Sequence, residues 1–392
     1  MSDRYRILTL DGGGAWAVIE AMTLIELYGE QTKGRDVLRD FDMVAANSGG
    51  SIVMGGLVED MTLGTLRDFF LSEDRRKSVF VRKPFHIPDL EKYDAAGKLD
   101  GLRQALPVCG DRRLSEVAKE TPGHLGKPVH LLVMGFDYDS NRGVFFRSAP
   151  ATRRGWGQGD TGPASLAECI HASSNAPIRY FDRPAELPGV PGRRYWDGAI
   201  SGANNPVLMA VSEALVLGQD PKNLAALSLG TGGTFLPLAE NDEQLPPLFQ
   251  VRHTPGLATD FLKITGAILD DPPDMASFMA HVMSGGPPQG YAPPVDSSIV
   301  RMNPMIAPVL NNEKEFVLPP GLDEPAFDRL AKMDMDAVEQ DQVDQIVAFA
   351  RLWLSGSVSN QPVRAEADLT LEIGQRSYDR AKLAWQRLTG QQ

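Results

Sequence analysis

Residues 5–28 of the chain read YRILTL-DGGG-AWAVIEAMTLIELY. The opening run is mostly apolar and has the length of a buried strand, and the glycines at residues 12–14 interrupt it with a flexible turn. The apolar side chains that follow have the spacing of a helix: Ile19, Met22, Leu24, Ile25 and Leu27. This stretch therefore predicts a strand, a tight turn and a helix in direct succession.

A second strand, turn and helix follow at residues 41–58. The predicted strand consists of Phe41, Met43, Val44 and Ala45, residues 47–50 form the turn, and the helix begins near Ile52. Apolar runs at residues 129–136 and 224–229 are also typical of strands. Strands that alternate with helices favour a parallel sheet covered on both faces. We therefore expect an α/β fold with three layers, α/β/α, and a mostly parallel central sheet.

Two segments lack the pattern of a core. Residues 74–97 are charged and interrupted by proline, and many of the 29 prolines fall in residues 233–300. Long irregular segments in a compact domain are often functional. Residues 74–110 and 233–300 are therefore candidates for lids over a site.

The C-terminal part has a helical pattern. Apolar spacings of three and four residues begin at about residue 324, and residues 376–388 predict one more surface helix. No repeat or sharp change of composition separates a second domain. We expect one domain over residues 1–310, with residues 311–392 as a helical extension packed on it.

The composition excludes several classes of protein. With 392 residues, of which 42% are hydrophobic, the chain can bury a sizeable core. Its net charge of −12 repels polyphosphate backbones, so we expect no nucleic acid partner. Cys109 and Cys169 are too few for a disulfide framework and are typical of a reducing compartment.

The sequence shows no signal or membrane segment. The N-terminal residues run straight into the first predicted strand and leave no room for a signal peptide. No apolar stretch approaches the ~18 residues that a transmembrane helix needs. We therefore expect a cytoplasmic protein that, if its substrate is a lipid, contacts a membrane surface transiently.

Ser48 lies at the second predicted turn, in the sequence Ala46-Asn47-Ser48-Gly49-Gly50. Such a strand-turn-helix exposes the serine hydroxyl, and the helix N-terminus behind it favours developing negative charge, as in the nucleophile elbow of serine hydrolases. The usual signature is Gly-x-Ser-x-Gly, and Ala46 replaces its first glycine. The alternative interpretation is a serine that caps a core helix.

Asp11-Gly12-Gly13-Gly14 follows the first predicted strand directly. Flexible residues there can turn backbone N–H groups toward an anion, which the tetrahedral oxyanion of acyl transfer requires. Nucleotide motifs fail, because a dinucleotide fingerprint needs a glycine where Ala17 stands and a P-loop needs Gly-Lys-Ser/Thr. We expect Asp11 to hold the turn by side-chain to backbone hydrogen bonds.

Further motifs occur downstream in a fixed order. They are Ala172-Ser173-Ser174-Asn175-Ala176-Pro177, then Trp196-Asp197-Gly198-Ala199 with Asn205-Pro206, and then Ser228-Leu229-Gly230-Thr231-Gly232. With the glycine-rich loop and the serine turn, this ordered set resembles the patatin-like phospholipase family over residues 6 to about 232. The resemblance implies a patatin-like fold that hydrolyses carboxylic esters of lipids, with phospholipid as the leading substrate.

The resemblance also implies roles for single residues. Ser48 would be the nucleophile and Asp197 its general base, in a dyad that works without histidine. The oxyanion hole would consist of Gly12, Gly13, Gly14 and Gly49, and the residues that support the motifs would be Asp11, Ala46, Gly50, Gly198 and Ala199. We expect no cofactor and no metal, because no two histidines have the spacing of a metal site. Some bacterial members of the family are switched on by cyclic nucleotides, so a small-molecule activator of that kind is a hypothesis for this chain.

Three positions depart from the family pattern. Trp16 stands where the family commonly has Arg or Lys, and Ala17 and Ala46 replace glycines. These departures keep open a catalytically weakened protein that binds lipid or acts as a scaffold. An esterase or thioesterase of soluble acyl compounds would share the same residues. A Ser-Asp-His triad with His253 or His281 is a further alternative.

Overall fold

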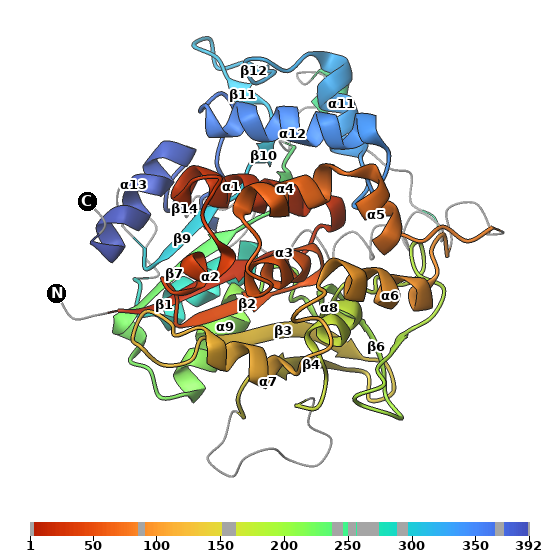
Figure 1. The fold of residues 1–392 in the computed structure, drawn as a ribbon. Coiled ribbons are helices and arrows are strands. Elements are labelled where there is room, and N and C mark those ends of the chain that lie inside the picture. The colour runs from red at the N-terminus through yellow and green to blue at the C-terminus, as the bar shows by residue number, and fades with distance from the viewer. Residues whose placement is uncertain are drawn as a thin grey trace.

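The computed structural model describes residues 4–84, 91–150, 162–236, 246–249, 256, 274–287, 297–364 and 372–390. Its centre is an eight-stranded sheet in the order β5-β6-β3-β2-β1-β7-β9, with β4 paired to β3 (Figure 1). The strands are β1 (Tyr5–Leu10), β2 (Met43–Ala46), β3 (His130–Asp137), β4 (Arg142–Arg147), β5 (Ala185–Glu186), β6 (Arg194–Asp197), β7 (Leu224–Leu229) and β9 (Ile299–Met302).

The sheet is mostly parallel, as the sequence predicts. Neighbouring strands from β3 through β2, β1 and β7 to β9 are parallel, whereas β4 and β6 run antiparallel to β3. In register, Leu10 pairs with Ala46 of β2 and with Leu229 of β7. The turns after these three strands therefore meet at one edge of the sheet, which brings the glycine-rich loop beside Ser48 and Thr231.

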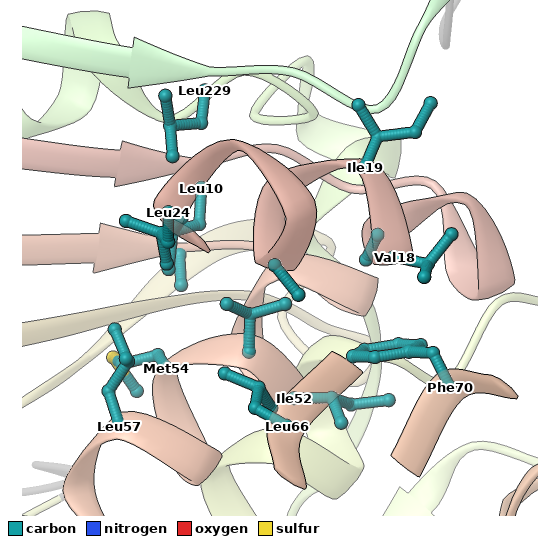
Figure 2. Packing of buried hydrophobic residues seen from close by; sticks show 14 of the residues in the cluster. Leu10, Val18, Ile19, Leu24, Ile52, Met54, Leu57, Leu66, Phe70 and Leu229 are labelled. Atoms are coloured by element: carbon teal, nitrogen blue, oxygen red, sulfur yellow. The ribbon is translucent and has the colours of Figure 1, made fainter. Parts of the chain in front are cut away.

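The sheet is covered on both faces. Along β1, Leu8 and Leu10 belong to a cluster that includes α1 (Val18–Tyr28) and α3 (Ser48–Val58). Tyr5 and Ile7 belong to the opposite cluster, with α9 (Val207–Val216) and the helix of residues 274–283. Because side chains alternate along a strand, a run that is apolar at nearly every position is buried on both sides. Figure 2 shows Leu10 and Leu229 of the sheet beneath the helices of the first cluster. The predicted three-layer α/β fold is confirmed.

The predicted C-terminal helices are present. They are α11 (Glu324–Lys332), α12 (Gln340–Leu354) and α13 (Tyr378–Thr389). In Figure 1, α12 lies on the outer side of α1, and the two helices are in contact. The Trp385 ring of α13 stacks on Phe41 with 5.8 Å between ring centroids. These helices thus extend the apolar core on which α1 and α3 pack.

The two candidate lid segments are partly described. In the first, α5 (Glu73–Val79) packs on α6 (Ala95–Ala105), and the rings of Phe80, Tyr93 and Phe181 pack together with centroids 5.2 to 6.2 Å apart. Residues 85–90 lie outside the described residues. So does most of residues 233–300, apart from residues 233–236, 246–249, 256, 274–287 and 297–300.

Shorter elements complete the described fold. The remaining helices are η1 (Gly14–Ala17), α2 (Gly34–Leu38), α4 (Leu63–Leu71), α7 (Leu114–Val117), η2 (Ala118–Glu120), α8 (Leu166–Ser173), η3 (Gly198–Ser201), η4 (Pro221–Asn223) and η6 (Pro247–Phe249). Three small two-stranded pairs are β8 (Gly233–Thr234) with β10 (Met305–Ile306), β11 (Val309–Leu310) with β12 (Phe316–Val317), and β13 (Val363–Arg364) with β14 (Glu372–Ile373). No helix in the described part of the chain combines the length and apolarity that a membrane crossing requires. Cys109 and Cys169 are free, buried thiols.

Candidate active site

Ser48 lies at the sharp turn between β2 and α3. Its φ of 46° is in the left-handed region, which a residue with a side chain adopts only where the surroundings impose it. The turn is tight because α3 approaches the glycine-rich loop closely: a Cβ on Gly49 would lie 2.5 Å from the Gly14 carbonyl oxygen. A Cβ on Gly50 would lie 2.5 Å from the Leu10 carbonyl oxygen. The two glycines after Ser48 are therefore required by this strained backbone geometry.

Asp197 ends β6 and is brought to Ser48 by the antiparallel pairing of β6 with β3. Its carboxylate accepts hydrogen bonds from Asn47 Nδ2 at 3.1 Å and from the Ala199 amide at 2.9 Å. Burial raises the pKa of the Asp197 carboxyl above its ordinary value, although these hydrogen bonds, the nearby Ser48 side chain and the charge of Lys98 act in the opposite direction. Asp197 is thus a stronger base than an exposed aspartate, and its carboxyl lies beside the Ser48 side chain.

Gly198, the next residue, allows Asp197 to approach the serine turn. A Cβ on Gly198 would lie 2.5 Å from Asn47 Oδ1. That same Asn47 side chain holds the carboxylate, so a larger residue at position 198 would push Asn47 away from Asp197. The Gly198 position predicted from the motif therefore has a steric reason.

The glycine-rich loop presents backbone amides beside Ser48. The Gly12 amide donates to the Asn204 carbonyl oxygen at 2.8 Å, and a Cβ on Gly12 would lie 3.1 Å from the Ser48 Cβ. The amides of Gly13, Gly14 and Gly49 have no hydrogen-bond acceptor among the described residues. Gly12 therefore keeps the loop close to the serine, while the other three amides remain able to bind an anion.

Asp11 lies beneath this loop in a buried cluster of charges. Its carboxylate accepts a hydrogen bond from Arg301 at 2.6 Å, and Arg301 also donates to Ser228 Oγ at 2.9 Å. The prediction that the Asp11 side chain bonds the turn backbone is wrong. Asp11 Oδ2 pairs with the buried Arg301 guanidinium instead, and Asp11 Oδ1 has no hydrogen-bond partner among the described residues. The Asp11 amide donates to Glu20 at 2.6 Å. Burial raises the pKa of Asp11 to about 6 against the effect of Arg301, and raises the pKa of Glu20 well above its ordinary value.

The segment of residues 172–177 makes hydrogen bonds to both Ser48 and Asp197. Ser173 Oγ accepts a hydrogen bond from the Ser48 amide at 2.9 Å. It also donates a hydrogen bond to Asn47 Oδ1 at 3.4 Å. The Asn175 carbonyl oxygen accepts the Asp197 amide at 3.0 Å. Sequence reasoning quoted this segment only as a motif and assigned no role to Asn47, Ser173 or Asn175. Their place inside the ordered motifs was the signal that could have found them.

Lys98 is a buried lysine that sequence reasoning missed altogether. It belongs to α6 and donates from Nζ to the Asn175 side chain at 3.1 Å. Desolvation lowers the pKa of Lys98 well below its ordinary value, and the charge of Asp197 opposes this effect. In the sequence it is one lysine in a helical stretch, with no motif around it.

The pocket above Ser48 is small. It has a volume of about 210 Å³ and is lined by Gly12, Gly13, Trp16, Ser48, Asp197, Ala199, Asn204, Thr231, Gly232, Gly233, Thr234, Ile306, Leu330, Met333, Asp334 and Met335. Ligand pockets for small organic molecules usually hold about 300–1,000 Å³. An acyl chain of lipid length therefore needs more room than this state of the pocket provides.

Residues 333–336, which we call the strap, cover the glycine-rich loop. The Ala15 amide donates to the Met335 carbonyl oxygen at 3.0 Å, and Trp16 Nε1 donates to the Asp334 carbonyl oxygen at 3.2 Å. Trp16, which stands where the family commonly has a basic residue, thus lines the pocket and is bonded to the strap.

Two carboxylates of the strap are held by cations and tyrosines. Asp334 accepts the Tyr180 hydroxyl and pairs with Arg179 at 3.2 Å. Asp336 accepts hydrogen bonds from Lys92 Nζ at 2.9 Å and from the Tyr93 hydroxyl at 2.8 Å. The strap is therefore fixed both to the glycine-rich loop and to the loops before α6 and after α8.

No histidine of the described residues lines the pocket above Ser48. His281 is buried elsewhere, with Nδ1 2.8 Å from Ser297 Oγ and Nε2 3.2 Å from the Pro287 carbonyl oxygen. His253 lies outside the described residues.

The chain resembles known proteins in sequence. The chain is 29% identical over 210 residues to "Intracellular phospholipase A2" of Caenorhabditis elegans; the match covers 54% of this chain and 17% of that relative. Among solved structures it is similar to VipD of Legionella pneumophila, with a TM-score of 0.34 and 11% identity over 89% of this chain and 67% of that one. The family model described as "Patatin-like phospholipase" matches residues 8–211, which contain both Ser48 and Asp197. The chain belongs to the patatin-like phospholipase family.

Proposed function

We propose that this chain is a lipid acyl hydrolase of the phospholipase A type, in which Ser48 and Asp197 form a catalytic dyad. The observation that carries the proposal is the buried Asp197 carboxylate beside the Ser48 side chain, in the wall of one pocket to which no described residue adds a histidine. A carboxylate whose pKa is raised by burial is a suitable base for a serine that lies next to it.

The reaction would proceed through an acyl-enzyme. Asp197 takes the Ser48 proton while Oγ attacks the ester carbonyl carbon, and the electron pair of the carbonyl moves to its oxygen. When the tetrahedral intermediate collapses, Asp197 returns the proton to the leaving alcohol. Asp197 then takes a proton from water, whose oxygen attacks the acyl carbon. When this second tetrahedral intermediate collapses, Asp197 returns the proton to Ser48 Oγ, and the fatty acid leaves.

The proposed oxyanion hole is formed by the amides of Gly13, Gly14 and Gly49. They lack acceptors among the described residues and lie where α3 meets the glycine-rich loop. The N-terminus of α3 adds a favourable field for negative charge. Removing one such donor typically costs about 3 kcal/mol of transition-state stabilisation. The support for this assignment is that these amides would otherwise remain without partners in a buried site.

The walls of the pocket favour an acyl chain as the bound group. Ile306, Leu330, Met333 and Met335 supply apolar surface to the pocket that Ser48 and Asp197 also line. We propose that long acyl chains enter when the strap moves away from the glycine-rich loop. A soluble short-chain ester would need no such movement, because its acyl group is small enough for a pocket of about 210 Å³.

The test compares wild type with Ser48→Ala and Asp197→Asn, on a chromogenic short-chain ester and on phospholipid vesicles. We expect both variants to lose about 10³-fold or more of kcat. Matched controls are Ser212→Ala on α9 and Asp379→Asn at the exposed start of α13, which should retain activity. Loss of activity in His253→Ala or His281→Ala alone would contradict a dyad. A wild type that binds vesicles but hydrolyses neither substrate would instead support a lipid-binding protein.

A further inference from the structure

Lys98 is buried completely, which is rare for a lysine because removing an ammonium group from water is costly. Its three N–H donors are all used: Nζ lies 2.9 Å from the His171 carbonyl oxygen, 3.1 Å from Asn175 Oδ1 and 3.3 Å from Ser174 Oγ. The Nζ atom also lies 4.1 Å from the centroid of the Phe181 ring. The buried Lys98 ammonium group therefore has a hydrogen-bond acceptor for each of its N–H groups and an aromatic ring beside it.

The acceptors around Lys98 match the charged ammonium form. Ser174 Oγ already donates its proton to the Ile170 carbonyl oxygen at 2.7 Å, so it can only accept from Lys98. The Asn175 amide is oriented by the bond from its Nδ2 to the Arg183 carbonyl oxygen at 2.8 Å, which leaves Oδ1 facing Lys98. The His171 carbonyl, Ser174 Oγ and Asn175 Oδ1 can only accept, so they need three N–H donors. The charged ammonium of lysine has three, whereas the neutral amine has two. The C-terminal end of α8, which provides the His171 carbonyl, also favours a cation.

The Lys98 site is connected to the dyad through Asn175. The side chain of Asn175 binds Lys98, and its main-chain carbonyl oxygen accepts the Asp197 amide at 3.0 Å. Two residues earlier, Ser173 Oγ accepts the Ser48 amide at 2.9 Å. Lys98 therefore anchors the segment on which both the nucleophile and the base rest.

The charge of Lys98 also reaches the dyad. Among the described residues, the titratable groups that interact electrostatically with Lys98 are Asp197 on β6 and His171 on α8. Desolvation lowers the pKa of His171 well below its ordinary value, so this side chain is neutral and adds no competing charge. The dyad carries one negative charge before the reaction, on Asp197, and one in the tetrahedral intermediate, on the oxyanion. Lys98 lies close enough to Asp197 for its charge to lower the pKa of that carboxyl.

We propose that Lys98 is a positioning residue of the active site, whose buried cation keeps Asp197 ionised as the base and fixes the segment of residues 173–175 under Ser48. This proposal rests on the proposed dyad. It gives the site a cation although Trp16 occupies the position where the family commonly has Arg or Lys. The cation comes from α6, behind the base, rather than from the glycine-rich loop.

The experiment measures kcat/KM against pH for Lys98→Met and Lys98→Gln with a soluble short-chain ester. Methionine keeps an unbranched side chain that is one atom shorter, and glutamine keeps two N–H donors, but both remove the charge. We expect kcat/KM to fall about 10- to 100-fold, and the acid limb of the profile to move to higher pH, because without the cation Asp197 is protonated more readily. The melting temperature should fall, because the buried acceptors of Lys98 lose donors, so the shift of the acid limb and not the melting temperature decides the role of the charge. Lys77→Met, an exposed lysine of α5, is the control and should keep the wild-type profile.

The outcomes separate this proposal from the proposed function. A wild type without esterase activity would refute the proposed function. An active wild type that Ser48→Ala inactivates, together with an unmoved acid limb in both Lys98 variants, would overturn the role of Lys98 alone. Lower activity with a lower melting temperature and an unmoved acid limb would show a structural role and would also overturn it. Failure of both variants to fold would lead to the same conclusion.

Discussion

The main-chain carbonyl oxygen of Met335 accepts a hydrogen bond from the Ala15 amide at 3.0 Å, directly above the glycine-rich loop. Gly14 makes this contact possible: it has a φ of 56°, and a Cβ there would lie 2.4 Å from the same oxygen. The C-terminal extension thus touches the loop that would bind the oxyanion. A movement of the strap would therefore break a contact with the glycine-rich loop.

Weakening the strap should favour long-chain substrates. Asp336→Asn weakens the interactions with Lys92 and Tyr93 without altering a residue that lines the pocket. Hydrogen bonds to charged groups are worth about 1.5 kcal/mol or more, so the open state should gain about tenfold or more in population. We expect the ratio of long-chain to short-chain ester hydrolysis to rise by a similar factor. Asp328→Asn on α11, which pairs with the exposed Lys332, is the matched control. An unchanged ratio would mean that the strap does not limit access.

Ser173 should matter for turnover although it does not reach the pocket. Ser173→Ala removes the acceptor of the Ser48 amide and leaves this buried N–H unsatisfied, which costs about 1–3 kcal/mol. Because the amide belongs to the nucleophile itself, we expect kcat to fall about 10- to 100-fold while KM for a short-chain ester changes little. Ser355→Ala, which loses a hydroxyl bonded to the carbonyl of its own helix, should behave as wild type. Equal kcat values in the two variants would refute the role of Ser173.

The pH dependence of turnover should report the ionisation of Asp197. The base must be ionised to take the Ser48 proton, so kcat/KM should fall as the pH drops through the pKa of Asp197 in the folded enzyme. Burial raises that pKa, which places the acid limb above the value of about 3.9 for a free aspartate. Asn47→Ala removes a hydrogen bond that lowers the pKa, so its acid limb should lie at still higher pH. Asn311→Ala, at an exposed turn, should not move it. A limb that moves to lower pH in Asn47→Ala would contradict this assignment of the base.

The sequence was sufficient for the first strand, the glycine-rich turn and the two strand-turn-helix units. In these stretches local pattern and tertiary packing favour the same structure, because β1 and β2 are buried on both faces and the glycines stand where backbones nearly touch. The family resemblance then indicated that Ser48 and Asp197 are partners. The structure brings them together through the antiparallel strand β6, which has no pattern of its own in the sequence.

The residues that surround the dyad could not be predicted from pattern. Lys98, Arg301 and Asp336 act through contacts with residues far away in the chain, and a single charged residue has no periodicity that reveals its partner. Asp11 illustrates the difficulty. A carboxylate at a turn usually bonds the nearby backbone, and only the parallel strands that place β9 beside β7 bring Arg301 to it.

The buried pair of Asp11 and Arg301 should make a large contribution to stability. Arg301→Met leaves the Asp11 and Glu20 carboxyl groups without their cation, and breaking a buried ion pair on one side costs about 3–5 kcal/mol. We expect the free energy of unfolding in urea to drop by about that amount at pH 8. Arg376→Met, an exposed arginine that pairs with Glu372, should change it little.

The loss in Arg301→Met should become smaller as the pH falls. In wild type the pKa of Asp11 is about 6, above its unfolded value of 3.8, so the folded protein binds more protons between these values and the contribution of Asp11 to stability decreases as the pH rises through this range. Arg301 lowers the pKa of Asp11 in the folded protein, so its removal raises that pKa further and widens the range. The variant should therefore recover part of the lost free energy of unfolding at pH 5, where the carboxyl groups can be protonated. A loss that is equal at pH 5 and pH 8 would mean that the cost arises from packing of the arginine side chain and not from its charge.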